Sequence, residues 1–154
     1  MNKAIILLSG TTPSRFIEIA KKSSWVWHIN INNFLGSRKN EFYWDGEEGQ
    51  FYNSFTHEFF ALIYKYFTAD DNEVKVAKGK VFTKFLLVVH GVSDNLVSTL
   101  KDEYGVFKIH LSNKERNEND ILNDVVLSED NGNFEEEVNK LIYILTSSNE
   151  KELV

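Results

Sequence analysis

The chain has 154 residues, the size of one domain, and is 42% hydrophobic and 26% charged, as soluble globular proteins are. The absence of cysteine excludes a disulfide framework, a thiolate zinc site and a catalytic cysteine. No apolar run approaches the length of a membrane span. We therefore expect a cytoplasmic protein with one domain over residues 1–146 and a frayed tail over residues 147–154.

The charge is unevenly distributed. The sequence carries a net charge of −6, and residues 112–154, with 4 basic and 11 acidic residues, account for −7. An acidic chain binds nucleic acid poorly, because phosphate affinity depends on clustered Lys and Arg. The acidic C-terminal third is either a solvated surface or a face for a basic partner. The local basic exception is a group of four lysines, Lys75, Lys78, Lys80 and Lys84.

The beginning of the chain predicts a strand, a tight loop, a helix and a second strand. Residues 3–10 are almost purely apolar and end in Ser-Gly, which is typical of a buried strand in a parallel sheet. Residues 15–22 have helical spacing, with Thr12 or Ser14 as the expected N-cap. Residues 25–31 are β-branched and aromatic, and they predict the second strand.

The middle of the chain predicts a long helix and the strongest strand. Residues 51–67 carry apolar side chains at positions i, i+4 and i+8 and predict a helix. Residues 68–83 are polar, and we expect a loop with a short element there. Residues 84–91 contain the longest apolar run and predict a strand at the centre of the sheet.

The last third continues the alternation. Residues 93–104 predict a helix that Gly105 terminates, and residues 106–111 and 124–127 predict strands. Residues 134–145 predict a closing amphipathic helix. Alternating strands and helices predict an α/β fold of three layers, with a mostly parallel sheet and helices on both faces.

In such sheets ligands bind beyond the carboxyl ends of the strands. The candidate loops are therefore residues 10–15, 28–33, 90–94, 111–116 and 130–133.

The first loop has the setting of a phosphate-binding loop, between a strand and a helix N-terminus. The full signature is G-x-x-x-x-G-K-[ST]. Counting from Gly10, the positions of the second Gly, the Lys and the hydroxyl hold Arg15, Phe16 and Ile17. A shift by one residue lets Arg15 meet a phosphate but leaves no hydroxyl for Mg²⁺. The loop is either a phosphate site or a strand-to-helix turn that keeps only the shape.

Several segments together resemble one family. They are Ile5–Gly10, Asn32–Leu35, Phe42–Gly46, Phe85–Leu96, and Asp124–Leu127 followed by Asn131–Glu135. In order and spacing, these segments resemble parts of the deoxynucleoside monophosphate kinases of tailed phages. Those parts are, in the same order, the first strand, the acceptor-site segment, the Gly-Trp-Asp-Gly segment, the central strand, and the last strand with the turn that follows it. The likeness spans nearly the whole chain and implies a P-loop nucleotide-kinase-like fold.

The chain departs from that family where the chemistry takes place. The Gly-Lys-Ser/Thr of the phosphate loop is missing, Asn32 replaces an acidic acceptor-site residue, and His90 begins the segment that replaces Asp-x-Arg. Phosphoryl transfer depends on positioning and on charge neutralisation by Lys, Arg and Mg²⁺. The losses argue against kinase activity. Arg116 lies where such kinases keep a lid arginine, or is an ordinary surface charge.

The resemblance implies a set of residues that a retained nucleotide site would use, with no catalytic residue and no metal ligand among them. The set is Gly10, Thr11, Thr12, Ser14, Arg15, Asn32, His90 and Arg116. ATP and Mg²⁺ are expected only if kinase activity survives. The four histidines have no metal-binding spacing.

Aromatic residues are 14% of the chain and gather in its first half. A helix that is apolar on several faces is either deeply buried or covered by a partner. The partner-binding candidates are Trp44, Tyr52, Phe60 and Tyr64.

Three hypotheses follow. The first is a degenerate kinase-like protein, phage-encoded, that binds a partner protein and blocks or redirects a host enzyme. The second is a nucleotide-binding protein without transfer, and the third is a divergent active monophosphate kinase.

Overall fold

A computed structural model describes residues 2–31, 48–69, 74–92, 94–112 and 124–152. The helices are α1 (Ser14–Ser23), α3 (Glu48–Ala69), α4 (Asp94–Tyr104) and α5 (Phe134–Glu152). The strands are β1 (Lys3–Gly10), β2 (Trp25–Asn30), β3 (Lys75–Ala77), β4 (Lys80–Phe82), β5 (Phe85–His90), β6 (Phe107–Ser112) and β7 (Val125–Ser128). No helix among these residues combines the length and the apolarity needed to cross a membrane.

Five strands form one sheet in the order β2-β5-β1-β6-β7, and each neighbouring pair is parallel. This confirms the α/β class and the parallel sheet. The strand expected at the centre, β5, is interior, but β1 takes the middle place. Because the strands are parallel, their carboxyl ends all meet at one edge of the sheet.

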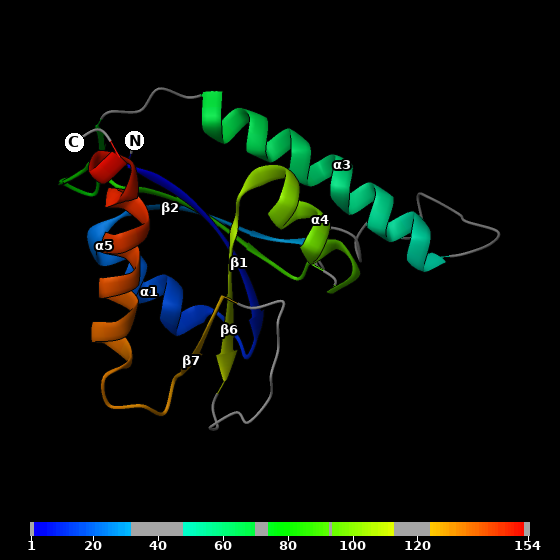
Figure 1. Ribbon diagram of the computed structural model, residues 1–154. Coiled ribbons are helices and arrows are strands. Elements are labelled where there is room, and N and C mark those ends of the chain that lie inside the picture. The colour runs from blue at the N-terminus through cyan, green and yellow to red at the C-terminus, as the bar shows by residue number, and fades with distance from the viewer. Residues whose placement is uncertain (1, 32–47, 70–73, 93, 113–123, 153–154) are drawn as a thin grey trace.

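Helices cover both faces of the sheet (Figure 1). On one face α1 and α5 form a buried cluster with the strands, which includes Phe16, Leu86 and Phe134. On the other face α3 and α4 do the same, through residues that include Phe60 and Leu87. The chain therefore leaves β1 toward one face of the sheet and leaves the neighbouring strand β5 toward the other face. The place between the carboxyl ends of these two strands is the switch point, where such sheets bind ligands.

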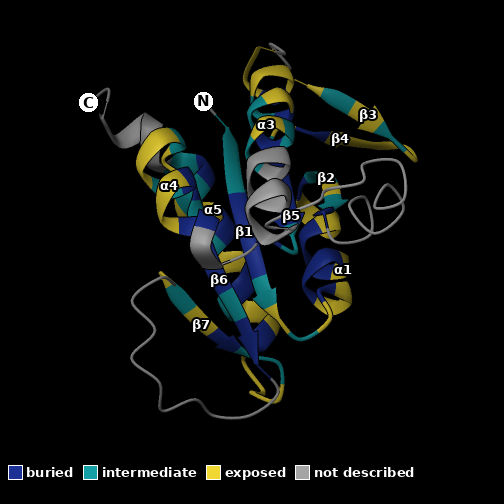
Figure 2. Cartoon of the chain, turned by 90° about the vertical axis from the view of Figure 1, so that its right-hand side faces the viewer, coloured by how far each residue is buried: buried dark blue, intermediate teal, exposed yellow. Residues whose placement is uncertain are grey.

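The core follows from this layering. All residues from Phe85 to Val89 of β5 are buried, as is the run from Ile6 to Leu8 in β1. A strand that helices cover on both faces has no solvent side, so it reads as a continuous apolar run rather than an alternating one. Figure 2 shows this burial in the middle strands, with exposed residues on the outer sides of the helices.

The short element expected within residues 68–83 is a two-stranded antiparallel hairpin, in which Val76 pairs with Val81. Its turn is Lys78-Gly79, and both residues have positive φ, 51° and 76°. Such a turn matches the right-handed twist of the two strands. One hairpin face is anchored, because Phe82 is buried and the Lys75 ammonium lies 3.8 Å from the centre of the Trp25 ring.

Two helix ends differ from those predicted from the sequence. The N-cap of α1 is Pro13, whose carbonyl accepts the Ile17 N–H at 2.9 Å, and no side chain caps the helix. At the other end of the chain, α5 runs to Glu152, beyond the helix end predicted at residue 145. Thr146 is buried in α5 and continues its packed face beyond the expected end.

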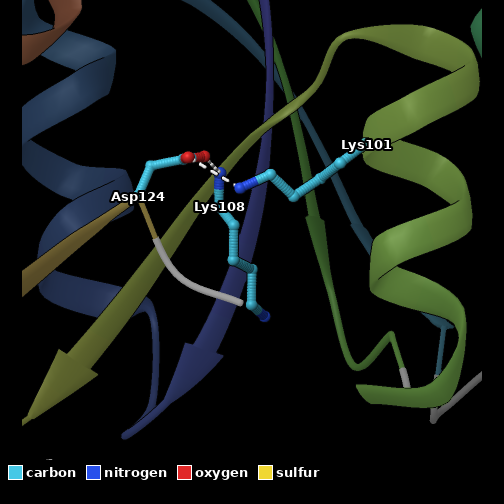
Figure 3. Close-up of polar contacts among 3 residues, drawn as sticks. All are labelled: Lys101, Lys108 and Asp124. Carbon is cyan, nitrogen blue, oxygen red and sulfur yellow. Dashed lines mark hydrogen bonds and ion pairs between the residues drawn. The ribbon is translucent and has the colours of Figure 1, made fainter. Parts of the chain in front are cut away.

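One carboxylate joins α4, β6 and the start of β7 (Figure 3). Asp124 accepts the backbone N–H of Lys108 at 2.7 Å through one oxygen and the Lys101 ammonium at 2.6 Å through the other. The Asp124 N–H in turn donates to the Lys108 carbonyl at 2.8 Å. Because the Lys101 and Asp124 side chains are 24% and 31% exposed, their ion pair is partly shielded from water.

We expect Asp124→Ala to lower the free energy of unfolding by about 1–2 kcal/mol, since it removes an acceptor of two charge-assisted hydrogen bonds. Asp124→Asn keeps an acceptor for the Lys108 N–H, and Lys101→Met removes only the ion pair, so both should cost less. Urea denaturation measures all three. An Asp124→Ala protein as stable as the wild type would contradict this role.

Candidate functional site

The carboxyl edge of the sheet brings together part of the predicted site. Leu8 is in register with His90, and Gly10 with Leu111, so the loop after β1 lies between the ends of β5 and β6. Thr11 follows directly. Asn32 and Arg116 lie outside the described residues.

The loop begins with a close approach of two backbones. Gly10 has a φ of +96°, and a Cβ at this position would overlap the carbonyl oxygen of Leu111. The next N–H, that of Thr11, donates to the same oxygen at 3.0 Å. Glycine is therefore required here for two reasons, the left-handed backbone and the lack of space. The expected tight turn exists, and its first N–H is already bonded within the chain.

The side chains of this loop contact the turn between β7 and α5. The Thr11 hydroxyl donates to the Glu129 carboxylate at 2.8 Å. The Arg15 guanidinium donates to the Glu129 carbonyl and lies 4.8 Å from the centre of the Phe134 ring. A phosphate loop needs donors that are free to face an anion. Here two donors face Glu129, and its carboxylate lies beside the loop.

The helix that follows retains one property of a phosphate site. The first turn of α1 contains no acidic residue, and no side-chain hydrogen bond caps it. Thr12 and Ser14, the expected caps and candidate ligands, are exposed. An uncapped helix start attracts anions weakly, but the carboxylate of Glu129 opposes that attraction.

Two polar pairs lie at the same edge on opposite faces of the sheet. Ser9 and His110 share a hydrogen bond of 2.8 Å between Oγ and Nδ1. His28 and His90 face each other with ring centres 6.4 Å apart. The Nδ1 atom of His90 is buried and has no hydrogen-bond partner among the described residues.

Both histidines of the second pair disfavour protonation. Burial lowers the pKa of His90 below its ordinary value of 6.5, and the Lys108 ammonium lowers it further. Burial also lowers the pKa of His28, with additional repulsion from His90 and Lys21. The lowered pKa values favour neutral imidazoles at this edge. Each neutral ring can donate one hydrogen bond through one nitrogen and accept one through the other.

The structure places the aromatic partner candidates mainly in the core. Phe60 is fully buried, so the expectation of a contact surface there is wrong. Tyr64 is half-buried and packs on Tyr104 with ring centres 4.6 Å apart. Among the α3 side chains that the structure describes, residues 57–69, the large apolar ones that are exposed are Leu62 and Tyr66. Trp44 and the side chain of Tyr52 lie outside the described residues.

Sequence reasoning missed the partners of the loop. Neither Glu129 nor His110 is among the residues predicted for the site. The available signals were positional, since Ser9 precedes the loop glycine and Glu129 directly follows β7. Only the parallel register between β1, β6 and β7 shows that these residues meet.

Comparison with known proteins adds no family, because no family model, curated protein or solved structure matches this chain. Within the part of the chain that the structure describes, no three His, Cys, Asp or Glu side chains cluster so as to hold a metal ion.

Gly10→Ala should lower the free energy of unfolding by more than about 2 kcal/mol, because it adds a backbone clash to the left-handed strain. Gly105→Ala is the matched control. That glycine also has a positive φ, +63°, but a Cβ there meets no atom within 4 Å. The control should cost only about 1 kcal/mol. Equal losses in denaturant titrations of the two variants would show that the approach to Leu111 carries no constraint.

Acid should destabilise the fold through His90. The unfolded chain binds the proton near pH 6.5, whereas the folded chain binds it only at lower pH. The unfolded state therefore holds more protons, and the contribution of His90 is complete above about pH 6.5 and is lost as the pH falls below it. His90→Phe should flatten the decrease in the free energy of unfolding between about pH 6.5 and 5. Denaturant titrations at several pH values test this, and parallel curves for both proteins would refute it.

Proposed function

We propose that this chain is a catalytically degenerate nucleotide-kinase-like protein that acts by binding a partner protein rather than by transferring phosphate. The observation that carries the proposal is the loop after β1. Its Thr11 and Arg15 donors bond to Glu129, and the Glu129 carboxylate stands where a phosphate would need positive charge. The resemblance to phage kinases points to a host enzyme as the partner.

A partner needs an exposed surface, and the hairpin offers one. Val76 and Val81 form a cross-strand pair on its outer face and are 69% and 65% exposed, and Val74, directly before β3, is 54% exposed. Isolated apolar residues on a surface are ordinary, but three on one small ribbon form a patch. The opposite face of the hairpin already packs against the body through Phe82.

The charge of the hairpin indicates the chemistry of its partner. Residues 74–84 contain four lysines and no acidic residue, in a chain whose net charge is −6. Lys78 at the turn and Lys80 on β4 are both exposed. An apolar centre with a basic rim fits an acidic protein segment that also presents apolar side chains, since complementary charge steers association and excludes wrong partners. We assign the partner surface to this hairpin.

Nucleotides should leave the stability of the protein unchanged. A ligand at about 100 times its dissociation constant adds roughly 2.7 kcal/mol, which raises the melting temperature by a few degrees. We expect no such shift with ATP and Mg²⁺ or with any deoxynucleoside monophosphate, and no release of ADP. A shift in the wild type would favour the nucleotide-binding alternative, and turnover would favour the kinase.

Partner capture should depend on the hairpin. A protein retained from a bacterial lysate by the wild type should be lost with Val76→Asp and with Lys80→Glu. Val126→Asp is the matched control, because Val126 is also an exposed strand valine, at 41%, but lies on β7. Equal retention by all variants would remove the hairpin as the contact surface. The absence of any specific partner, together with nucleotide turnover, would refute the proposal itself.

A further inference from the structure

The turn between β7 and α5 contains the one Asn-Gly step of the sequence, Asn131-Gly132 (Figure 1). Both residues are exposed. Two backbone hydrogen bonds shape the turn at Asn131. Its N–H donates to the Ser128 carbonyl at 3.1 Å, and its own carbonyl accepts the Phe134 N–H at 3.0 Å. The main chain of Asn131 is therefore fixed on both sides.

The side-chain amide of Asn131 is held by two further contacts. Its Oδ1 accepts the backbone N–H of Asn133 at 3.0 Å, and its Nδ2 donates to the Glu137 carboxylate at 3.3 Å. An Asx turn of this kind folds the side chain back along the two residues that follow. A donor on the amide oxygen also stabilises the negative charge that develops there when a nucleophile adds to the amide carbon.

The nucleophile next to this amide carbon is the backbone nitrogen of Gly132. Its N–H donates to no atom among the described residues, so no hydrogen bond has to open before it reacts. Glycine has no side chain to hinder the attack. A Cβ at Gly132 would meet no atom within 4 Å, so the space around this nitrogen is also open.

The two other asparagines of this segment are equally exposed but differ in the N–H that follows them. Asn133 precedes Phe134, whose N–H is bonded to the Asn131 carbonyl. Asn139 lies inside α5, where the next N–H bonds to the carbonyl four residues earlier. Among these three asparagines, Asn131 therefore combines exposure with an unbonded nucleophile.

We propose that Asn131 is a site of spontaneous deamidation. The Gly132 nitrogen loses its proton and forms a bond to the side-chain carbon of Asn131, which closes a succinimide ring. The bond from this carbon to Nδ2 breaks, and the proton leaves with the released ammonia. Water then opens the ring at either carbonyl and leaves an aspartate or an isoaspartate at position 131. The reaction consumes one water and releases one ammonia, with no oxidant or cofactor.

The modification alters the turn that contacts the loop after β1. Glu129, two residues before Asn131, accepts hydrogen bonds from Thr11 and Arg15. Either product places a new carboxylate beside Glu137, in a chain whose net charge is already −6. Isoaspartate also inserts the side-chain methylene into the main chain between Glu129 and α5. This chemistry belongs to the turn alone and does not rest on the proposed function.

Incubation of the full chain at weakly alkaline pH tests the proposal, with peptide mass spectrometry to locate the change from amide to acid. Asn131 should lose ammonia at least about tenfold faster than Asn133 and Asn139, because a backbone hydrogen bond must first open at those positions. The urea-denatured chain is the reference. Equal rates at the three asparagines of the folded chain would overturn the proposal. So would an Asn131 that stays intact in the folded chain after it has reacted in the denatured one.

Variants identify the attacking atom. Gly132→Ala should slow the reaction at least about tenfold, because the methyl group hinders the nitrogen. The fold accepts this change, since Gly132 is not among the glycines with positive φ and its Cβ has space. Asn133→Ser is the matched control, because it replaces a neighbouring asparagine but keeps the N–H that bonds to Asn131. It should react at the wild-type rate.

The product separates the two possible attacks. Attack by Gly132 gives isoaspartate together with aspartate, whereas direct hydrolysis by water gives aspartate alone. Enzymatic methylation of isoaspartate measures the first product. Aspartate as the sole product, or an unchanged rate in Gly132→Ala, would show that the Gly132 nitrogen is not the nucleophile.

Discussion

The close contact between the loop after β1 and the carbonyl of Leu111 constrains the whole carboxyl edge. Gly10 lies so close to β6 that no side chain fits, and the Thr11 N–H then bonds to the same carbonyl. This fixes where the loop leaves the sheet and thus where α1 starts. The parallel pairing of β6 with β7 sets the position of Glu129 within reach of Thr11. The register of three strands therefore determines which side chains meet at the candidate site.

The same constraint determines how the polar side chains of the loop after β1 are used. A loop between a strand and a helix normally offers backbone N–H groups and an uncapped helix start. In this chain the loop side chains form a closed set of contacts with Glu129 and Phe134. These contacts hold α1 and α5 together at their N-terminal ends. The polar side chains of the loop, Thr11 and Arg15, therefore contribute to structure.

Much of the fold could be predicted, because a parallel strand that helices cover on both faces is a continuous apolar run in the sequence. The runs at Ile6–Leu8 and Phe85–Val89 are of this kind. The hairpin was expected only as an unspecified short element, because its strands are three residues each and a pattern that short is weak. The contacts of Glu129 were beyond prediction for another reason. They depend on strand order, which local patterns do not encode.

The burial of its side chains decides between the two interpretations of the aromatic helix α3, a core helix or a partner surface. Sequence spacing could not distinguish a core helix from a partner surface, and the structure assigns Phe60 to the core while Leu62 and Tyr66 stay exposed. Two aromatic side chains of α3, Phe60 and Tyr64, instead pack against Tyr104 of α4. The Lys3 ammonium of β1 donates to the Phe67 carbonyl in the last turn of α3, which has no basic residue of its own there, so the start of β1 stabilises the end of that helix.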